Sequence, residues 1–170
     1  PPVVDAGSNA STCQDVAINL ASVLPTPASA SNYSSLLWDD GGAPGTFNNA
    51  TLLHPTYTPA VGQTGAVTLT LTANGNTGCS SVSDNMTLTI TPKPVVDAGS
   101  NASTCEGVAI NLATVLPTPA SASNYSSLSW DDGGAPGTFN DATLLHPTYT
   151  PAVGQTGTVT LTLTANGNGS

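Results

Sequence analysis

The sequence predicts an all-β protein made of two tandem β-sandwich modules. Residues 2–78 return as residues 94–170 at a constant offset of 92, with eight differences in 77 aligned positions. Apolar residues and threonines alternate over several segments, which is the pattern of strands with one buried face. No segment shows helical periodicity of useful length. A fixed repeat of strand-rich sequence indicates an array of modules.

The strands expected in the first repeat follow from these patterns in chain order. Threonine alternates with apolar residues most clearly in 67–72 and 86–91, and β-branched and aromatic residues mark shorter segments. Proline and glycine separate the segments and indicate turns. The expected strands are residues 2–6, 16–20, 33–38, 56–58, 67–72 and 86–91. Residues 21–32, which include two prolines, are expected to form a loop.

One tryptophan in each repeat refines the fold class. Trp38 lies in an expected strand and is predicted to fill the core between two sheets, as the strand-C tryptophan does in immunoglobulin-like sandwiches. We therefore expect tandem immunoglobulin-like modules, repeat 1 over residues 1–92 and repeat 2 over residues 93–170. The two prolines of the linker, residues 91–94, favour an extended and semi-rigid connection.

The second repeat is expected to lack its last strand. It stops at Ser170, the counterpart of Gly78, so the counterpart of segment 86–91 is not in the sequence. Two interpretations are open. The sequence is a piece of a longer array, or a strand from another chain completes the open edge by strand addition.

The charge balance excludes several classes of partner. Lys93 is the sole basic side chain against ten acids, which gives a net charge of −9. Phosphate recognition needs Lys and Arg, so we expect no nucleic acid partner and no docking on an anionic membrane. No run of about 20 apolar residues occurs, so we expect no direct membrane insertion.

The cysteines suggest an oxidising compartment. Cys13 and Cys79 occur once each in the complete repeat and are expected to form an intramodule disulfide near one pole of the sandwich. Cys105 is then expected to pair with a residue beyond the chain end. Disulfides belong to oxidising compartments, so this pairing predicts an extracellular location. A pair of buried thiols is the alternative.

Several segments together resemble a known family. They are Val-Asp-Ala-Gly at 4–7, Thr-Cys at 12–13, Trp-Asp-Asp-Gly-Gly at 38–42 with Gly-Thr-Phe at 45–47, Pro-Thr-Tyr-Thr-Pro at 55–59, and the segments 65–71 and 79–88. In order and spacing they resemble the immunoglobulin-like (PKD-like) repeats of giant Bacteroidota surface adhesins, including the gliding-motility adhesin. The resemblance implies a secreted, non-enzymatic cell-surface array that carries adhesion, often exported by the type IX system. The Asp39-Asp40 pair departs from the Thr-Gly or Ser-Gly of that pattern, which leaves open a site particular to this protein.

Acidic side chains are the only candidates for a metal site. Carboxylates next to flexible glycines suit calcium, but Asp and Gly also belong in solvated β-turns. The calcium candidates are the turn residues Asp39, Asp40, Asp131 and Asp132 and the module-entry residues Asp5 and Asp97. The preferred expectation is that no cofactor is needed.

Nothing in the sequence indicates catalysis. His54 and His146 each precede a proline, and no nucleophile motif accompanies them, so we expect turn or surface histidines and no enzyme. The favoured function is a structural or adhesive repeat of a long surface protein or filament, whose partners are neighbouring repeats, identical chains, or surface glycans and other cells. The alternative is a calcium-dependent or carbohydrate-binding module repeated for avidity.

Overall fold

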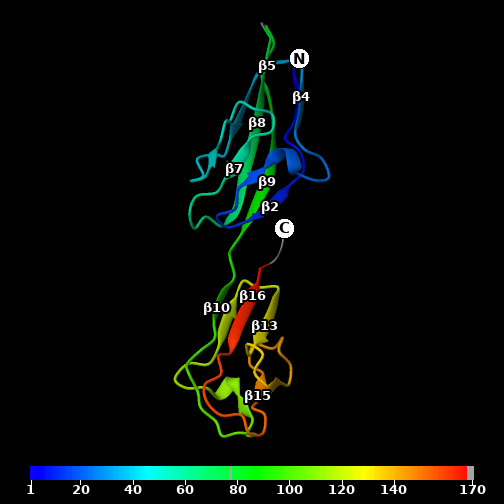
Figure 1. The fold of residues 1–170 in the computed structure, drawn as a ribbon. Helices are drawn as coiled ribbons and strands as arrows, with labels where there is room; N and C mark the ends of the chain where they lie inside the picture. The colour runs from blue at the N-terminus through cyan, green and yellow to red at the C-terminus, as the bar shows by residue number, and fades with distance from the viewer. Residues whose placement is uncertain (77, 168–170) are drawn as a thin grey trace. The chain divides into compact units, whose positions relative to one another are not determined.

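The computed structural model describes residues 1–76 and 78–167, which fold into two compact units that divide between Pro92 and Lys93. We call residues 1–92 module 1 and residues 93–170 module 2. Each contains β-strands and one short 3-10 turn, η1 (Leu20–Ser22) or η2 (Leu112–Thr114) (Figure 1). No helix within the described ranges is long and apolar enough to span a membrane.

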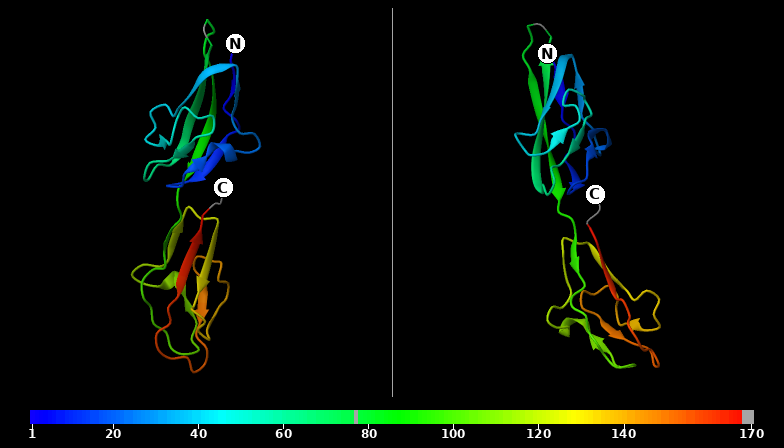
Figure 2. Two further views of the ribbon diagram at one scale, coloured as in Figure 1. Left: turned by 45° about the horizontal axis from the view of Figure 1, so that its top comes forward. Right: turned by 60° about the vertical axis from the view of Figure 1, so that its left-hand side comes forward.

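The described residues of module 1 form an immunoglobulin-like sandwich with nine strands. They are β1 (Val3–Asp5), β2 (Ala10–Cys13), β3 (Ile18–Asn19), β4 (Ser29–Ser31), β5 (Tyr33–Asp39), β6 (Thr46–Phe47), β7 (Thr56–Thr58), β8 (Gly65–Gly75) and β9 (Val82–Thr91). One sheet has the order β2-β9-β8-β5, and the facing layer contains β3-β7-β6 and the pair β1-β4. Figure 2 shows the long β8–β9 hairpin in green as the centre of the four-stranded sheet.

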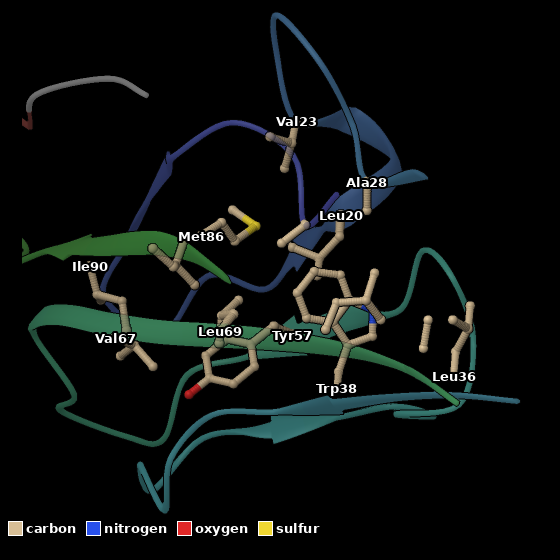
Figure 3. Close-up of a cluster of buried hydrophobic side chains, with 14 residues drawn as sticks. Leu20, Val23, Ala28, Leu36, Trp38, Tyr57, Val67, Leu69, Met86 and Ile90 are labelled. Carbon is tan, nitrogen blue, oxygen red and sulfur yellow. The ribbon is translucent and has the colours of Figure 1, made fainter. Parts of the chain in front are cut away.

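Apolar residues alternate with polar ones along the strands, so the apolar side chains of both layers point into one core. Along β8 and β9 the threonines point outward, while Leu69, Leu71 and Leu88 are fully buried. Trp38 of β5 and Tyr57 of β7 meet them from the two sheets and are 2% and 0% exposed (Figure 3). The prediction that Trp38 fills the space between the sheets is confirmed.

Module 2 repeats this plan with fewer strands. Its strands are β10 (Val95–Asp97), β11 (Ile110–Asn111), β12 (Ser121–Ser123), β13 (Ser127–Asp131), β14 (Thr138–Phe139), β15 (Thr148–Thr150) and β16 (Thr162–Asn166). They form the groups β11-β15-β14, β13-β16 and β10-β12. Within the described residues of module 2, no strand corresponds to β2 or β9.

The described part of module 2 has no strand to pair as β9 does, and its counterpart of β8, β16, is shorter than β8. In module 1 residues 65–69 pair with β9 alone, because β5 begins to pair with β8 only at Thr70. The equivalent residues 157–161 are not in a strand, and β16 begins at Thr162. A strand needs a ladder partner for its backbone groups, so both β2 and the first half of β8 depend on β9.

The expected Cys13–Cys79 disulfide is wrong. Cys13 ends β2, which runs parallel to β9 and places Cys13 beside Thr91 at the last residue of that strand. Cys79 lies in the turn before β9, close to Gly75. A ten-residue strand is roughly 30 Å long, whereas the Cα atoms of a disulfide lie within about 7 Å. The two cysteines therefore occupy opposite ends of the module.

Candidate functional site

The acidic turn after β5 is the densest group of predicted site residues. The Asp39 Oδ1 atom accepts the N–H of Gly41 at 2.9 Å, and the Asp40 Oδ1 atom accepts the N–H of Gly42 at 3.2 Å. Gly41 and Gly42 have φ angles of +67° and +82°, a conformation that glycine adopts without steric cost. The two carboxylates therefore hold their own turn in shape, in the manner of Asx turns.

Tyr57 connects this turn to the core. Its ring lies edge-on to Phe47 with centroids 5.1 Å apart, and its hydroxyl donates to the Asp40 Oδ2 atom at 3.3 Å. The Gln63 Nε2 group donates to the same hydroxyl at 3.4 Å, while Gln63 Oε1 accepts the N–H of Ala60. A Cβ atom at Gly45 would collide with the Tyr57 ring, so glycine is required there.

The hydroxyl of Tyr57 is electrostatically perturbed. Burial raises the pKa of Tyr57 above its ordinary value of 10.0, the hydrogen bond from Gln63 opposes this, and the charge of Asp40 reinforces it. Tyrosine is neutral when protonated, so burial disfavours the anion. In the unfolded chain Tyr57 ionises first as the pH rises, so the stability linked to the buried phenol is complete below about pH 10 and is lost above it.

Replacing Tyr57 by Phe should destabilise module 1 and weaken its alkaline transition. We expect the free energy of unfolding to fall by about 1 kcal/mol at neutral pH, because the Asp40 and Gln63 groups lose a hydrogen-bond partner. As the pH rises above about 10, the variant should lose less additional stability than the unmodified protein, because it has no phenol to ionise at this position. Denaturant titration at both pH values measures this. Tyr33→Phe is the control, since Tyr33 is exposed. Equal alkaline behaviour of both variants would contradict the interpretation.

The calcium candidates are spread over separate turns. Asp131 and Asp132 repeat the turn of module 1, accepting the N–H groups of Gly133 and Gly134 at 3.0 and 3.2 Å. Asp5 and Asp97 accept the N–H groups two residues ahead of each, at 2.7 and 2.8 Å. Among the described residues no three His, Cys, Asp or Glu side chains are placed to share a metal ion. The calcium interpretation stays a prediction.

Each of the two histidine side chains makes a hydrogen bond to a backbone carbonyl of its own module. The His54 Nε2 atom lies 2.8 Å from the carbonyl oxygen of Ala28, and the His146 Nε2 atom lies at the same distance from that of Ala120. A carbonyl can only accept, so each imidazole donates through Nε2. Both side chains are half-buried and join the segment before β7 or β15 to the loop that follows the 3-10 turn.

A feature that the sequence did not indicate is the parallel pairing of β2 with β9. Four residue pairs join them, from Ala10 beside Leu88 to Cys13 beside Thr91. The Gln14 N–H donates to the Thr91 carbonyl at 2.8 Å, and the Thr91 hydroxyl donates to the Thr12 carbonyl at 3.2 Å. This ladder joins residues 10–13, near the start of module 1, to the last strand of the module.

Comparison with known proteins finds similarity among solved structures. No protein-family model matches the chain, and no curated protein matches it. Among solved structures it is similar to a three-Ig I-band fragment of titin and to an E-to-A mutated variant of that fragment. Each is 14% identical, with a TM-score of 0.42, over 90% of this chain and 56% of that chain. The chain thus spans about half the length of these structures, and similarity at this level carries no argument about function.

Proposed function

We propose that this chain is a load-bearing structural repeat of a long extracellular surface protein, of the adhesin type that its sequence resembles. The observation that carries the proposal is the parallel β2–β9 ladder. Chain tension enters module 1 before β2 and leaves it after β9. Because the strands are parallel, tension pulls β2 toward its own start and β9 toward its own end.

This geometry loads the whole ladder at once. The two strands would have to slide past each other, so all their hydrogen bonds resist together, whereas an antiparallel hairpin pulled at its open end can separate one bond at a time. Each bond contributes about 0.5–1.5 kcal/mol, and the buried side chains of β9 add the cost of exposing Met86, Leu88 and Ile90, which are 1%, 0% and 1% exposed. Sliding β2 past β9 therefore requires several contacts to break in one step.

The near-identity of the two repeats supports the same role. Six of the eight differences between the repeats fall at positions described in both modules, and in module 1 none of these six is buried. The core positions that both modules contain therefore have the same residues, as expected for a module copied for length. We also propose the extracellular setting and type IX export from the resemblance. The redox argument for that setting loses its support, because the expected Cys13–Cys79 bridge does not form.

Single-molecule pulling with two proline variants tests the function. Amides two residues apart point to the same side of a strand. The Ala10 N–H therefore points to β9, as the Gln14 N–H does, while the Ser11 N–H points away. Ala10→Pro should lower the unfolding force of module 1 by removing a ladder donor and distorting the parallel pairing.

Ser11→Pro is the matched control, because proline is tolerated on an edge strand where its nitrogen faces solvent. In both variants the contour length of unfolded module 1 (Pro1–Pro92) should stay roughly 300 Å, at about 3.3 Å per residue, and the gain on unfolding is this length minus the span of the folded module. An equal loss of force in both variants would contradict the proposal that the β2–β9 ladder bears the load.

A further inference from the structure

Residues 6–9 of module 1 follow β9 although they do not belong to its ladder. In the ladder, residues 10–13 of β2 lie beside residues 88–91, which is an offset of 78. Two side-chain hydrogen bonds upstream of β2 join residues that are also 78 apart in the sequence. The N-terminal segment is therefore in register with β9 over residues 6–13 and not only over β2.

The two bonds connect backbone amides to side-chain oxygens in opposite directions. The Asp84 Oδ2 atom of β9 accepts the Ala6 N–H at 2.8 Å. Further along, the Asn9 Oδ1 atom accepts the Thr87 N–H of β9 at 2.8 Å. Side chains thus take the place of the backbone carbonyls that a continuous ladder would use.

The chain kinks at Gly7 as it changes layers between β1 and β2. β1 pairs with β4 in the facing layer, whereas β2 pairs with β9. Gly7 has a φ angle of +88°, and a Cβ atom there would lie 2.8 Å from the Thr26 carbonyl oxygen, so glycine is required. The Asp5 Oδ1 atom accepts the Gly7 N–H at 2.7 Å. The crossing segment is therefore joined to β9 by side chains in place of a backbone ladder.

Asp84 is a carboxylate on the apolar face of β9. Alternate residues of a strand point to one face, so Asp84 shares its face with Met86 and Leu88, which are buried. The Asp84 side chain is half-buried, and Ala6, whose N–H it accepts, is 1% exposed. A hydrogen bond to a carboxylate is stronger than a neutral one, and partial burial strengthens it further. Of the two bonds, that of Asp84 should therefore contribute more.

We propose that Asp84 and Asn9 are positioning residues that extend the load-bearing contact with β9 from β2 to the whole of residues 6–13. This inference rests on the proposed load-bearing role of module 1. Tension from the N-terminal side reaches residues 6–9 before it reaches β2. The two side-chain bonds are therefore sheared together with the ladder, and they hold the start of β2 in register with β9.

Single-molecule pulling on the whole chain tests this inference with three substitutions. Asp84→Ala removes the acceptor and should raise the unfolding rate of module 1 at a given force about tenfold, the factor that corresponds to about 1.4 kcal/mol. Asp84→Asn keeps a side-chain oxygen that can accept the Ala6 N–H and should restore most of the lost resistance. Asn9→Ala should raise the rate by a smaller factor than Asp84→Ala.

Asn19→Ala is the matched control. The Asn19 Oδ1 atom also accepts a backbone N–H, that of Ala21 at 2.9 Å, but this bond caps η1 and does not involve β9. The equilibrium stability of module 1 should fall in this variant, because a cap is lost. Its unfolding rate under force should not change, because sliding β2 past β9 does not break the cap.

The inference is overturned if Asp84→Ala leaves the unfolding rate under force unchanged, if Asp84→Asn unfolds as fast as Asp84→Ala, or if Asn19→Ala accelerates unfolding as much as Asn9→Ala. If Asp84→Ala prevents folding, the exposed Asn9 decides the matter through Asn9→Ala.

The Ala10→Pro variant separates this inference from the proposed function. If Ala10→Pro weakens module 1 while Asp84→Ala and Asn9→Ala do not, the ladder bears load without residues 6–9, and only the present inference is wrong. If none of the three weakens module 1, the proposed function is wrong as well.

Discussion

Trp38→Ala should cost module 1 about 3–5 kcal/mol of folding free energy. Truncating a buried tryptophan removes its transfer free energy and leaves a cavity. Trp38 is 2% exposed, its ring centroid lies 6.1 Å from that of Phe47, and its indole N–H donates to the Leu53 carbonyl at 3.2 Å. The lost ring contact adds about 0.5–1.5 kcal/mol.

A loss of this size approaches the whole stability of a small domain, which is typically about 5–15 kcal/mol. Hydrogen exchange resolved by module measures the effect, because a two-module chain need not unfold in one step. The neighbouring substitution Leu37→Ser is the control. Leu37 is 49% exposed, and the second repeat already carries Ser129 at this position. A loss below about 1 kcal/mol for Trp38→Ala would contradict the assigned core.

The strands that the sequence predicted best are those whose pattern is strong locally. Threonine and apolar residues alternate through β8 and β9, and both strands form, longer than predicted. A strand was expected over residues 16–20, but β3 contains only Ile18–Asn19, and Leu20 begins the 3-10 turn. The expected loop 21–32 contains β4 (Ser29–Ser31). Such short strands carry too little periodicity to be recognised.

The strand β2 could not be predicted from its own residues. The sequence Ala-Ser-Thr-Cys forms β2 at residues 10–13 but is not in a strand at residues 102–105. The local sequence is identical, so the difference comes from the partner strand, which lies more than 70 residues away in the chain. Sheet formation depends on such context more than on propensity.

The same lack of long-range information explains the incorrect disulfide. Counting cysteines gave two per repeat, but their distance depends on the direction of β9 relative to β2, which no local pattern records. In the candidate site the Asp-Gly turn was predictable from composition. Its contact with Tyr57 was not, because 17 residues separate Asp40 from Tyr57 and only the packing of β7 brings them together.

Leu88→Asp should remove the strand structure of residues 10–13 and 65–69, whose counterparts 102–105 and 157–161 in module 2 are not in strands. Leu88 is fully buried in β9, and a carboxylate there would lack any compensating partner, which costs more than about 3 kcal/mol. We expect β9 to detach and residues 10–13 and 65–69 to lose their protection. Residues 70–75 should keep theirs, because the β13–β16 pair persists in module 2 without an equivalent of β9.

The adjacent substitution Thr89→Asp provides the matched control. Thr89 belongs to the same strand but is exposed on its outer face, so the same aspartate should change stability by no more than about 0.5 kcal/mol. Hydrogen exchange then compares residues 10–13 and 65–69 with residues 102–105 and 157–161 in one molecule. If the first set stays protected in Leu88→Asp, β9 does not organise these segments. If residues 70–75 also lose protection, the β5–β8 pair depends on β9 as well, and the independence inferred from module 2 is wrong.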